Sequence, residues 1–476
     1  MHGFEGHDDK PASSGDVSSG PWFTELNRYH WFVLIVAALG WLFDTMDQQL
    51  FALARRPAMM ELLSVKEKQP DGTIKVIPPA NDKLGEYAGY TTSIFLMGWA
   101  LGGLSFGVLG DRIGRARVML WTILLYSVCT GLSALSWDFQ SFAFFRFITG
   151  LGVGGEFAVG VSLVAEVMPH RARPFALGLL QALSAIGNIT AALINMGLGM
   201  IPDDINGEGV ADWRIMFVIG AVPALLALLV RRNLKEPERW QATAVSDDKK
   251  QLGSYSEMFG HPVWSRHALL GMILGFAGVV GLWGIGFFSF DLLSSVLRKQ
   301  FVAQGMDPAE IAKQIPWWVG ITSIMQNLGA FFGIYAFSYL THGIGRKASF
   351  AITLVLAMGS TILVFGWLNQ FRDIFWMVPL MGFCQLALFG GYAIYFPELF
   401  PTRLRSTGTS FCYNVGRFVA AVGPLCFGML VSRVFSEANG YKEGMREAGM
   451  AMSCVFLLGL FVLPFLPETK GKPLPE

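Results

Sequence analysis

The sequence predicts an all-α membrane protein with about twelve transmembrane helices in two six-helix halves. Hydrophobic residues make up 53% of the chain, charged residues only 15%, and the mean hydropathy is +0.46. A soluble domain of this length would carry more charge. Apolar runs long enough to cross a bilayer recur along the chain. Short patterns in the first half of the sequence also return about 230 residues later.

Other features of the composition narrow the function. The net charge of +1 gives no reason to expect a nucleic-acid partner. The five cysteines lie inside apolar segments and have neither metal-ligand spacing nor the pattern of a disulfide framework. The sequence contains no phosphate-binding loop and no catalytic cluster. We therefore expect that the protein is not an enzyme and binds no metal and no cofactor. A proton is expected as its coupling ion.

The chain divides into two tails, two halves and a linker. Residues 1–27 are polar and rich in Gly and Ser, without the apolar core of a signal peptide, and are expected to form a disordered cytoplasmic tail. The first half covers 28–232, a charged cytoplasmic linker 233–266, the second half 267–466 and a second tail 467–476. The predicted spans are 31–54, 87–109, 117–136, 140–165, 174–200, 213–232, 267–296, 316–341, 348–368, 374–397, 407–432 and 448–466.

The first span contains the most informative stretch, Trp41–Phe51, with the sequence WLFDTMDQQLF. Asp44 and Asp47 are three residues apart, so they share a helical face, and Gln48 joins them. One ionised Asp at the centre of a membrane helix costs about 2.5–3.5 kcal/mol on insertion scales. Such a pair persists where it meets a counter-charge, water or a substrate. It is either an interior polar pair that fixes helix packing or a proton or ligand site in a transport pathway.

The short loops predict the orientation in the membrane. Basic residues follow the second, fourth, eighth and tenth spans, and the loops on the opposite side are poor in Lys and Arg. Both termini are therefore expected on the cytoplasmic side of the cell (inner) membrane, with the long 55–86 connection outside. The basic loop residues are Arg112, Arg115, Arg117, Arg171, Arg173, Arg346, Lys347, Arg403 and Arg405.

An internal repeat organises the chain. A shift of 232 residues aligns Glu166–Arg173, EVMPHRAR, with Glu398–Arg405, ELFPTRLR. A shift of 231 aligns Gly114 and Arg115 with Gly345 and Arg346. Since six spans return the chain to its starting side, the two halves run in the same sense.

These residues resemble the motifs of the major facilitator superfamily. Gly107–Arg117, GVLGDRIGRAR, is similar to the loop between the second and third helices of that family, and Arg146–Glu156 to the fourth-helix motif of its proton-coupled members. Glu236–Trp240 and Pro467–Gly471 resemble elements of its sugar and organic-acid porters. The resemblance covers Trp31 to Glu476 and implies the major facilitator fold and a protein that acts as a monomer.

A narrower resemblance is to the aromatic-acid and related metabolite:proton symporters. It rests on Asp44-x-x-Asp47 in the first span and on Asn414-x-x-Arg417 in the eleventh. The sequence also departs from the family pattern. Ala116 interrupts the usual basic pair, and His342 stands where the second half should carry an acid. An acid-based gate is therefore expected in the first half only.

The charges at the helix ends suggest a gate between the halves. Asp111 and Arg115 are four residues apart at a membrane boundary, and charge pairs of this kind hold two halves together while one side is closed. The alternative is that these charges only obey the positive-inside rule. The predicted gating residues are Asp111, Arg112, Arg115, Glu166, Arg171, Arg173, Glu398, Arg403 and Arg405.

Two further charges are expected near the middle of the membrane. Glu156 lies at about the depth of Asp44 and could share a proton with Asp44 and Asp47, so at least one of the three should hold a proton near neutral pH. Alternatively, Glu156 only belongs to a glycine-rich stretch that allows another helix to pack closely. Arg417 has a planar fork that suits a carboxylate, so it meets either a substrate anion or an acid of the protein.

Polar and aromatic side chains at helical spacing complete the predicted substrate site. Any one such stripe is as well explained by helix packing as by a ligand. The predicted substrate-binding residues are Arg417, Asn414, Gln48, Gln181, Asn188, Trp283, Gln326, Gln385 and Tyr392.

The sequence leaves three functions open. The first is a secondary transporter that couples a proton to a small organic anion, a carboxylate. The second is a facilitator or proton antiporter for sugars or drugs on the same fold. The third is a membrane sensor that has lost transport, against which the intact acids, gate and Arg417 argue.

Overall fold

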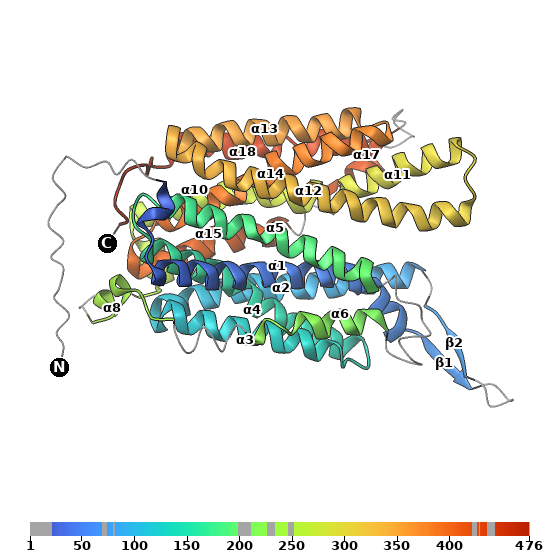
Figure 1. Ribbon diagram of the computed structural model, residues 1–476, viewed down its shortest axis with the longest axis horizontal. Helices are drawn as coiled ribbons and strands as arrows, with labels where there is room; N and C mark the ends of the chain where they lie inside the picture. The colour runs from blue at the N-terminus through green and yellow to red at the C-terminus, as the bar shows by residue number, and fades with distance from the viewer. Residues whose placement is uncertain are drawn as a thin grey trace.

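The computed structural model shows an elongated bundle of helices (Figure 1). The first half, from blue to green, lies beside the second half, from yellow to red. Residues 22–25 and 463–475 lie at one end of the bundle, called here the terminal end, and a small hairpin lies at the other, the hairpin end. The structure describes residues 21–68, 74–79, 81–198, 211–225, 234–245, 252–420, 426–427, 429–435 and 443–475.

Two helices of the first half begin at polar caps. Asn27 and Asp138 each accept a hydrogen bond from the backbone of the first turn that follows, which satisfies an otherwise free N–H. Gly114, with φ 121°, makes the sharp turn between the second and third helices. The elements are η1 (Trp22–Glu25), α1 (Arg28–Leu62), β1 (Val65–Lys68), β2 (Ile74–Ile77), α2 (Asn81–Ile113), α3 (Arg115–Ser133), α4 (Phe139–Val167), α5 (Arg173–Leu198) and α6 (Asp212–Gly220).

The second half repeats this order after two short helices of the linker. Gly345, with φ 96°, makes the turn equivalent to Gly114. The elements are α8 (Glu238–Val245), α9 (Tyr255–Gly260), α10 (Pro262–Val279), the π-helical η3 (Val280–Gly286), α11 (Phe287–Ala303), α12 (Pro308–Ile344), α13 (Arg346–Trp367), η4 (Phe371–Asp373), α14 (Ile374–Glu398), η5 (Thr402–Leu404), α15 (Arg405–Ala420), η6 (Leu430–Val434), α17 (Gly444–Met452), α18 (Val455–Val462) and η8 (Leu463–Phe465).

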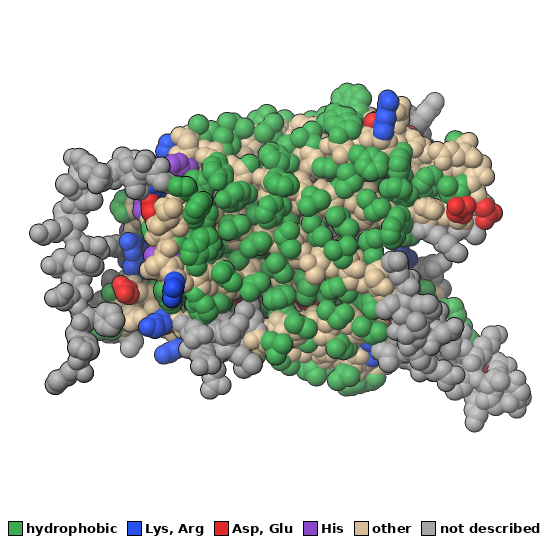
Figure 2. Space-filling view, in the orientation of Figure 1, with side chains coloured by type: hydrophobic (Ala, Val, Ile, Leu, Met, Phe, Trp, Pro, Cys, Tyr) green, Lys and Arg blue, Asp and Glu red, His purple; other side chains and the backbone are tan. Residues whose placement is uncertain are grey.

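The bundle has the dimensions and surface of a multi-pass membrane protein. Among the described residues, ten helices are long and apolar enough to span a bilayer. The other two predicted spans, 213–232 and 407–432, fall partly outside the described residues. Hydrophobic side chains form a broad belt around the middle of the face shown in Figure 2, and charged side chains gather toward the two ends.

The structure differs from the predicted boundaries in two places. The 55–86 connection is largely ordered, since α1 continues to Leu62 and β1 and β2 form an antiparallel hairpin. The predicted disordered tail is wrong for residues 21–27, where η1 forms and Trp22 is buried. The rest of that tail lies outside the described residues.

The halves meet most extensively along two pairs of helices, α2 with α15 and α5 with α12. Small residues permit this close approach. A Cβ at Gly103 of α2 would lie 2.3 Å from Nδ2 of Asn414, and one at Gly107 would lie 2.6 Å from Cβ of Ser410. Toward the terminal end, the same holds for Gly178 of α5 and Ser338 of α12. The two halves are thus packed together on the terminal side of the bundle.

Candidate functional site

The acids of α1 lie in the interior of the first half. Asp44 and Asp47 are fully buried, and Glu156 of α4 is buried beside them. A Cβ at Gly40, one turn before Asp44, would lie 2.4 Å from Oε1 of Glu156. Glu156 therefore packs directly against α1 because position 40 is glycine. The structure brings all three predicted proton-coupling residues into one region.

Asp47 has a basic partner. Nη1 of Arg146 lies 3.6 Å from Oδ1 of Asp47, and Thr130 donates a hydrogen bond of 2.7 Å to the same oxygen. Arg146 also donates to Ser133 and Thr149. Arg146 is fully buried, although it lies toward one end of its span. Its charge is compensated inside the first half.

Asp44 and Glu156 have no such compensation. Neither carboxylate oxygen of Asp44 has a hydrogen-bond partner of normal geometry among the described residues, although the Gln48 amide and Arg417 lie within electrostatic reach. Among the described residues, Oε2 of Glu156 accepts a hydrogen bond of 2.6 Å from Thr122, and its Oε1 accepts none. An ionised carboxylate buried in this way is costly. These two groups are therefore suited to gaining and losing a proton.

The facing half supplies a buried cation. Arg417 of α15 donates to the backbone oxygen of Tyr413 and to Oδ1 of Asn414, each at 3.2 Å. Its guanidinium lies 4.0 Å from the ring centroid of Tyr413 and 4.2 Å from that of Trp99, which belongs to the first half. No carboxylate among the described residues forms an ion pair with Arg417, and its Nε has no acceptor. Part of the fork is thus free for an anion.

Three of the other predicted substrate residues lie on α5 and α12. Gln181 and Gln326 are buried, and the Oε1 of Gln181 has no hydrogen-bond partner among the described residues. Asn188 is engaged, because its amide donates to Asn327 across the halves at 3.0 Å.

Gln385 and Tyr392 of α14 contact their own half. Gln385 donates to Thr361 at 2.6 Å, and the hydroxyl of Tyr392 donates to the backbone oxygen of Leu274 at 2.9 Å. These two bonds join neighbouring helices of the second half. The side chain of Trp283 lies outside the described residues.

A network of charges closes the terminal end. Both oxygens of Asp111 accept hydrogen bonds from the first backbone N–H groups of α15, those of Ser406 and Thr407, at 3.1 and 2.8 Å. These groups have no partner within their own helix, and the positive helix end favours an anion. Arg115 pairs with Asp111 at 2.8 Å and with Glu166 at 3.0 Å.

The second half contributes a cation to this network. Arg405 pairs with Glu166 at 2.8 Å, and both side chains are buried. Two acids and two bases, Asp111, Glu166, Arg115 and Arg405, therefore neutralise one another across the junction of the halves. A buried network of this kind is strongly destabilised when one member is removed.

The repeat-equivalent site in the second half is different. Arg346 and Glu398 form a bidentate pair, with N–O distances of 2.7 and 3.0 Å, and Arg173 lies within electrostatic reach of Glu398. His342, at the position equivalent to Asp111, contacts the ring of Phe175 instead. An acid at this position would find one donor fewer at the start of α5, because Pro174, the equivalent of Ser406, has no N–H.

Three predicted gating residues lie beside the network. Arg112 donates to the backbone oxygen of Leu252 at 3.1 Å. Arg171 and Arg403 pair with Glu25 at 2.9 Å and with Glu257 at 2.7 Å. Both acids belong to short segments that precede the first helix of a half.

The two motifs that follow the sixth and last spans cap helices. Glu236 accepts hydrogen bonds from the backbone of Ala116 and Arg117, at 3.2 and 3.1 Å. Glu468 does the same for Arg346 and Lys347, at 2.9 and 3.0 Å. Each glutamate thus fixes the N-terminus of a helix, α3 or α13, next to the charge network.

Sequence reasoning missed the hydroxyls that hold the acids. Thr122 and Thr130 are eight residues apart on α3, so they lie on one helical face and reach Glu156 and Asp47 respectively. Their spacing inside an apolar span is the signal that could have found them. Trp99, which stacks on Arg417, carried no distinguishing pattern.

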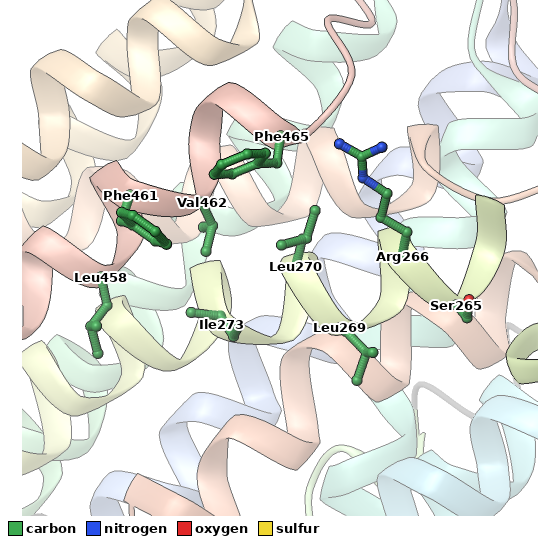
Figure 3. Close-up of a pocket in the computed structure, with 9 residues that line it drawn as sticks. All are labelled: Ser265, Arg266, Leu269, Leu270, Ile273, Leu458, Phe461, Val462 and Phe465. Atoms are coloured by element: carbon green, nitrogen blue, oxygen red, sulfur yellow. The ribbon is translucent and has the colours of Figure 1, made fainter. Parts of the chain in front are cut away.

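A separate groove lies on the outer surface between α10 and α18 (Figure 3). It has a volume of about 770 Å³, and apart from Ser265 and Arg266 its lining is hydrophobic. Leu269, Ile273 and Phe461 are among its lining residues. It contains none of the predicted site residues, so its size does not make it the functional site.

Comparison with known proteins identifies the fold and family. The family model described as sugar (and other) transporter matches residues 63–257 and 374–476. A cis,cis-muconate transport protein of Acinetobacter baylyi is 29% identical, over 81% of this chain and 86% of its own. The niacin transporter NiaP of the same species is 26% identical, over 94% of this chain and 96% of its own.

The solved structure of a proton:xylose symporter, XylE, superimposes with a TM-score of 0.72 at 17% identity, over 94% of this chain and 98% of that one. At that identity the likeness concerns the fold alone. The structure of the human organic anion transporter MFSD10 has a TM-score of 0.66 at 15% identity, over 92% of this chain and 100% of that one. The matched proteins are transporters and not enzymes. This chain belongs to the sugar (and other) transporter family of the major facilitator superfamily, and it is a multi-pass membrane transporter of small molecules.

Proposed function

We propose that this transporter carries a small organic anion, a carboxylate, across the membrane together with a proton, by alternating access of one central site. The observation that supports it best is the arrangement of charges between the halves. Within the described part of the chain, Asp44 and Glu156 of the first half have carboxylate oxygens without a hydrogen-bond partner, and Nε of Arg417 in the second half has no acceptor. An anion between them would complete the coordination of Arg417.

Coupling follows from the cost of burying charge. When the anion binds Arg417 and a proton binds Asp44, Asp47 or Glu156, the occupied site carries little net charge. Loading only one of the two leaves an uncompensated charge in the bundle and resists the movement of the halves. The proton and the anion are therefore transported together.

Asp47 has a distinct part in this cycle. Its pair with Arg146 is neutral as it stands, and protonation of Asp47 would release the Arg146 charge. Release would change the packing between α1 and α4, the helices that also carry Asp44 and Glu156. Proton binding at Asp47 is thus linked to the geometry of the acids that face the anion.

The substrate class is supported by two relatives. The cis,cis-muconate transport protein and the niacin transporter are named for compounds that carry carboxylates. The bidentate geometry of a free guanidinium fork suits that group. The sugar transporter description of the family favours the second candidate, a sugar-type facilitator or antiporter, in which Arg417 would have no anion to bind.

The protein is proposed to act as a monomer in the cell (inner) membrane. Its terminal end is proposed to face the cytoplasm. The basic loop residues gather there, including Arg112, Arg117 and Lys347. In this proposed orientation, the charge network that joins the halves at that end would shut the cytoplasmic side.

Reconstitution into vesicles tests the function. A panel of radiolabelled carboxylates and a neutral sugar is supplied with an inward proton gradient, and uptake is compared with and without a protonophore. The proposal expects one or more carboxylates to accumulate, and the protonophore to abolish accumulation. Sugar uptake that is insensitive to the protonophore would support the facilitator instead.

A further inference from the structure

We propose that two short segments, one before the first helix of each half, act as reciprocal latches that hold the terminal end closed. The first latch is residues 21–27, which contain η1 and precede α1. The second latch is residues 252–260, which contain α9 and precede α10. Each latch is attached to its own half and docks on the other.

The latches are part of the internal repeat. The shift of 232 residues that aligns Arg171 with Arg403 also aligns Glu25 with Glu257. Both aligned pairs are ion pairs in the structure, at 2.9 and 2.7 Å. The same shift places Phe23 on Tyr255. Two equivalent contacts at equivalent places indicate one structural device used twice.

The first latch is anchored on the first half. Glu25 pairs with Arg171, and the ring of Trp22 stacks on Phe175 of α5, with centroids 5.7 Å apart and planes 10° apart. Trp22 also contacts Trp31 of α1, at 6.2 Å. These contacts stay within one half, so the latch would move with it.

The first latch reaches the second half at α12. The Trp22 indole is near enough to the Tyr335 hydroxyl to interact with it. Trp22 and Phe23 share a hollow of about 270 Å³ with Tyr335 and Tyr339 of α12. Trp22 therefore sits over the junction of α5 and α12, which separates when the terminal end opens.

The second latch is arranged the other way round, with its anchor on the second half and its docking contacts on the first. It is anchored on the second half, because Glu257 pairs with Arg403 and the N–H of Gly253 donates to the backbone oxygen of Arg403 at 2.9 Å. Gly253 has a φ of 59°, which glycine adopts without strain.

It docks on α2 of the first half. The hydroxyl of Tyr255 donates to the backbone oxygen of Leu104 at 3.0 Å, and Arg112 donates to the backbone oxygen of Leu252 at 3.1 Å. The second latch thus covers the junction of α2 and α15, as the first covers that of α5 and α12.

The arrangement determines what is lost on opening. Separation of the halves leaves both Glu–Arg anchors intact and breaks only the docking contacts. Each latch therefore favours the closed state without depending on the buried charge network. This inference rests on the proposed alternating access, since latches matter only if the halves move.

The test measures the distance between the halves at the terminal end. The five native cysteines are replaced, and spin labels are placed at Arg117→Cys and Ala348→Cys. These exposed positions are equivalent under the 231-residue shift. Pulsed electron resonance in vesicles then gives the ratio of open to closed populations. Trp22→Ala and Tyr255→Phe each remove a docking contact, and Trp264→Ala is the control, because its ring contacts are with His261 and His267 of its own half.

Each latch variant should raise the open-to-closed ratio by about 2- to 10-fold, the range for one aromatic or hydrogen-bonded contact. The double variant should show the product of the two effects, because the latches lie on separate junctions. The control should leave the ratio unchanged. If both open and closed populations are seen but neither latch variant shifts their ratio more than the control does, the latch proposal is wrong and alternating access stands. A single distance at every pH and with every carboxylate tested would overturn alternating access, and with it the proposed function.

Discussion

Nη1 of Arg146 lies 3.6 Å from Oδ1 of Asp47, and both side chains are fully buried. This relationship divides the two acids of α1. The charge of Asp47 is compensated by Arg146 within the first half. Asp44 instead lies within electrostatic reach of Glu156 and of Arg417 from the second half. Two carboxylates on one helical face therefore have different partners, and only the removal of Asp47 leaves the buried Arg146 without its ion pair.

The first prediction concerns the stability of this pair. Arg146→Ala leaves the Asp47 carboxylate without its cation and should destabilise the protein by about 3–5 kcal/mol, the usual cost of breaking a buried pair. Thermal unfolding in detergent measures it. The double variant Asp47→Asn, Arg146→Gln removes both charges and should recover part of the loss. A double variant as unstable as Arg146→Ala would show that the pair is not the cause.

The second prediction concerns the gate. Asp111→Asn loses the charge that accepts from the α15 N-terminus and from Arg115. Bonds to charged groups contribute about 1.5–3 kcal/mol each, so the open-to-closed ratio at the terminal end should rise about 10- to 100-fold and transport should slow. Cysteine accessibility from the cytoplasmic side measures the ratio. Asp138→Asn, at a helix cap of the hairpin end, is the control, and equal accessibility in both variants would rule out a gating role.

The third prediction concerns orientation. Ser64 lies between α1 and the hairpin, and Val245 is exposed on α8 at the terminal end. In a background without the native cysteines, an impermeant thiol reagent should label Ser64→Cys in intact cells. It should label Val245→Cys only after permeabilisation. The reverse pattern would invert the proposed topology.

The fourth prediction concerns pH and Glu468, which lies outside the spans. Burial raises its pKa, but the backbone N–H groups of Arg346, Lys470, Lys347 and Thr469 outweigh it, so the pKa is lowered from the usual 4.5. A carboxyl with a lowered pKa stabilises the fold above its ordinary pKa, and the contribution is lost as pH falls through the lowered value.

Glu468→Gln should therefore unfold at a lower temperature than the unaltered protein at pH 7. The difference should shrink as the pH falls below about 4. Glu238→Gln, which changes an exposed acid on α8, is the control. A difference that stays constant with pH would assign the effect to lost packing and not to charge.

Much of this architecture could be predicted from hydropathy and repetition. Apolar runs of membrane length are set by the bilayer, so the helices follow directly from composition. The repeat aligned Arg346 with Arg115 and Glu398 with Glu166, and the structure shows each Arg paired with the Glu of its own half. Spacing along the chain does not reveal which partners meet across helices. Arg146 and Asp47 are about a hundred residues apart, and only the packing of α1 on α4 brings them together.

The site shows the same limit. Gln385 and Tyr392 have the spacing of ligand-binding residues, but each bonds a neighbouring helix of its own half. Helical periodicity marks a face that is polar, and both helix packing and ligand binding place polar groups on such a face. The ordered segment at 21–27 was missed because its contacts, such as Trp22 on Phe175, are far apart in sequence.

The central claim is that proton and anion are coupled through Asp44, Asp47, Glu156 and Arg417. The most direct measurement compares accumulation driven by a proton gradient with exchange of substrate at equal pH, in the same vesicles. Asp44→Asn and Asp47→Asn should abolish accumulation and retain exchange, because each removes a proton site and leaves Arg417 in place. Arg417→Ala should abolish both, and Arg417→Lys should restore them poorly, since Lys has no bidentate fork. Normal accumulation against a gradient by both Asp variants would contradict the account.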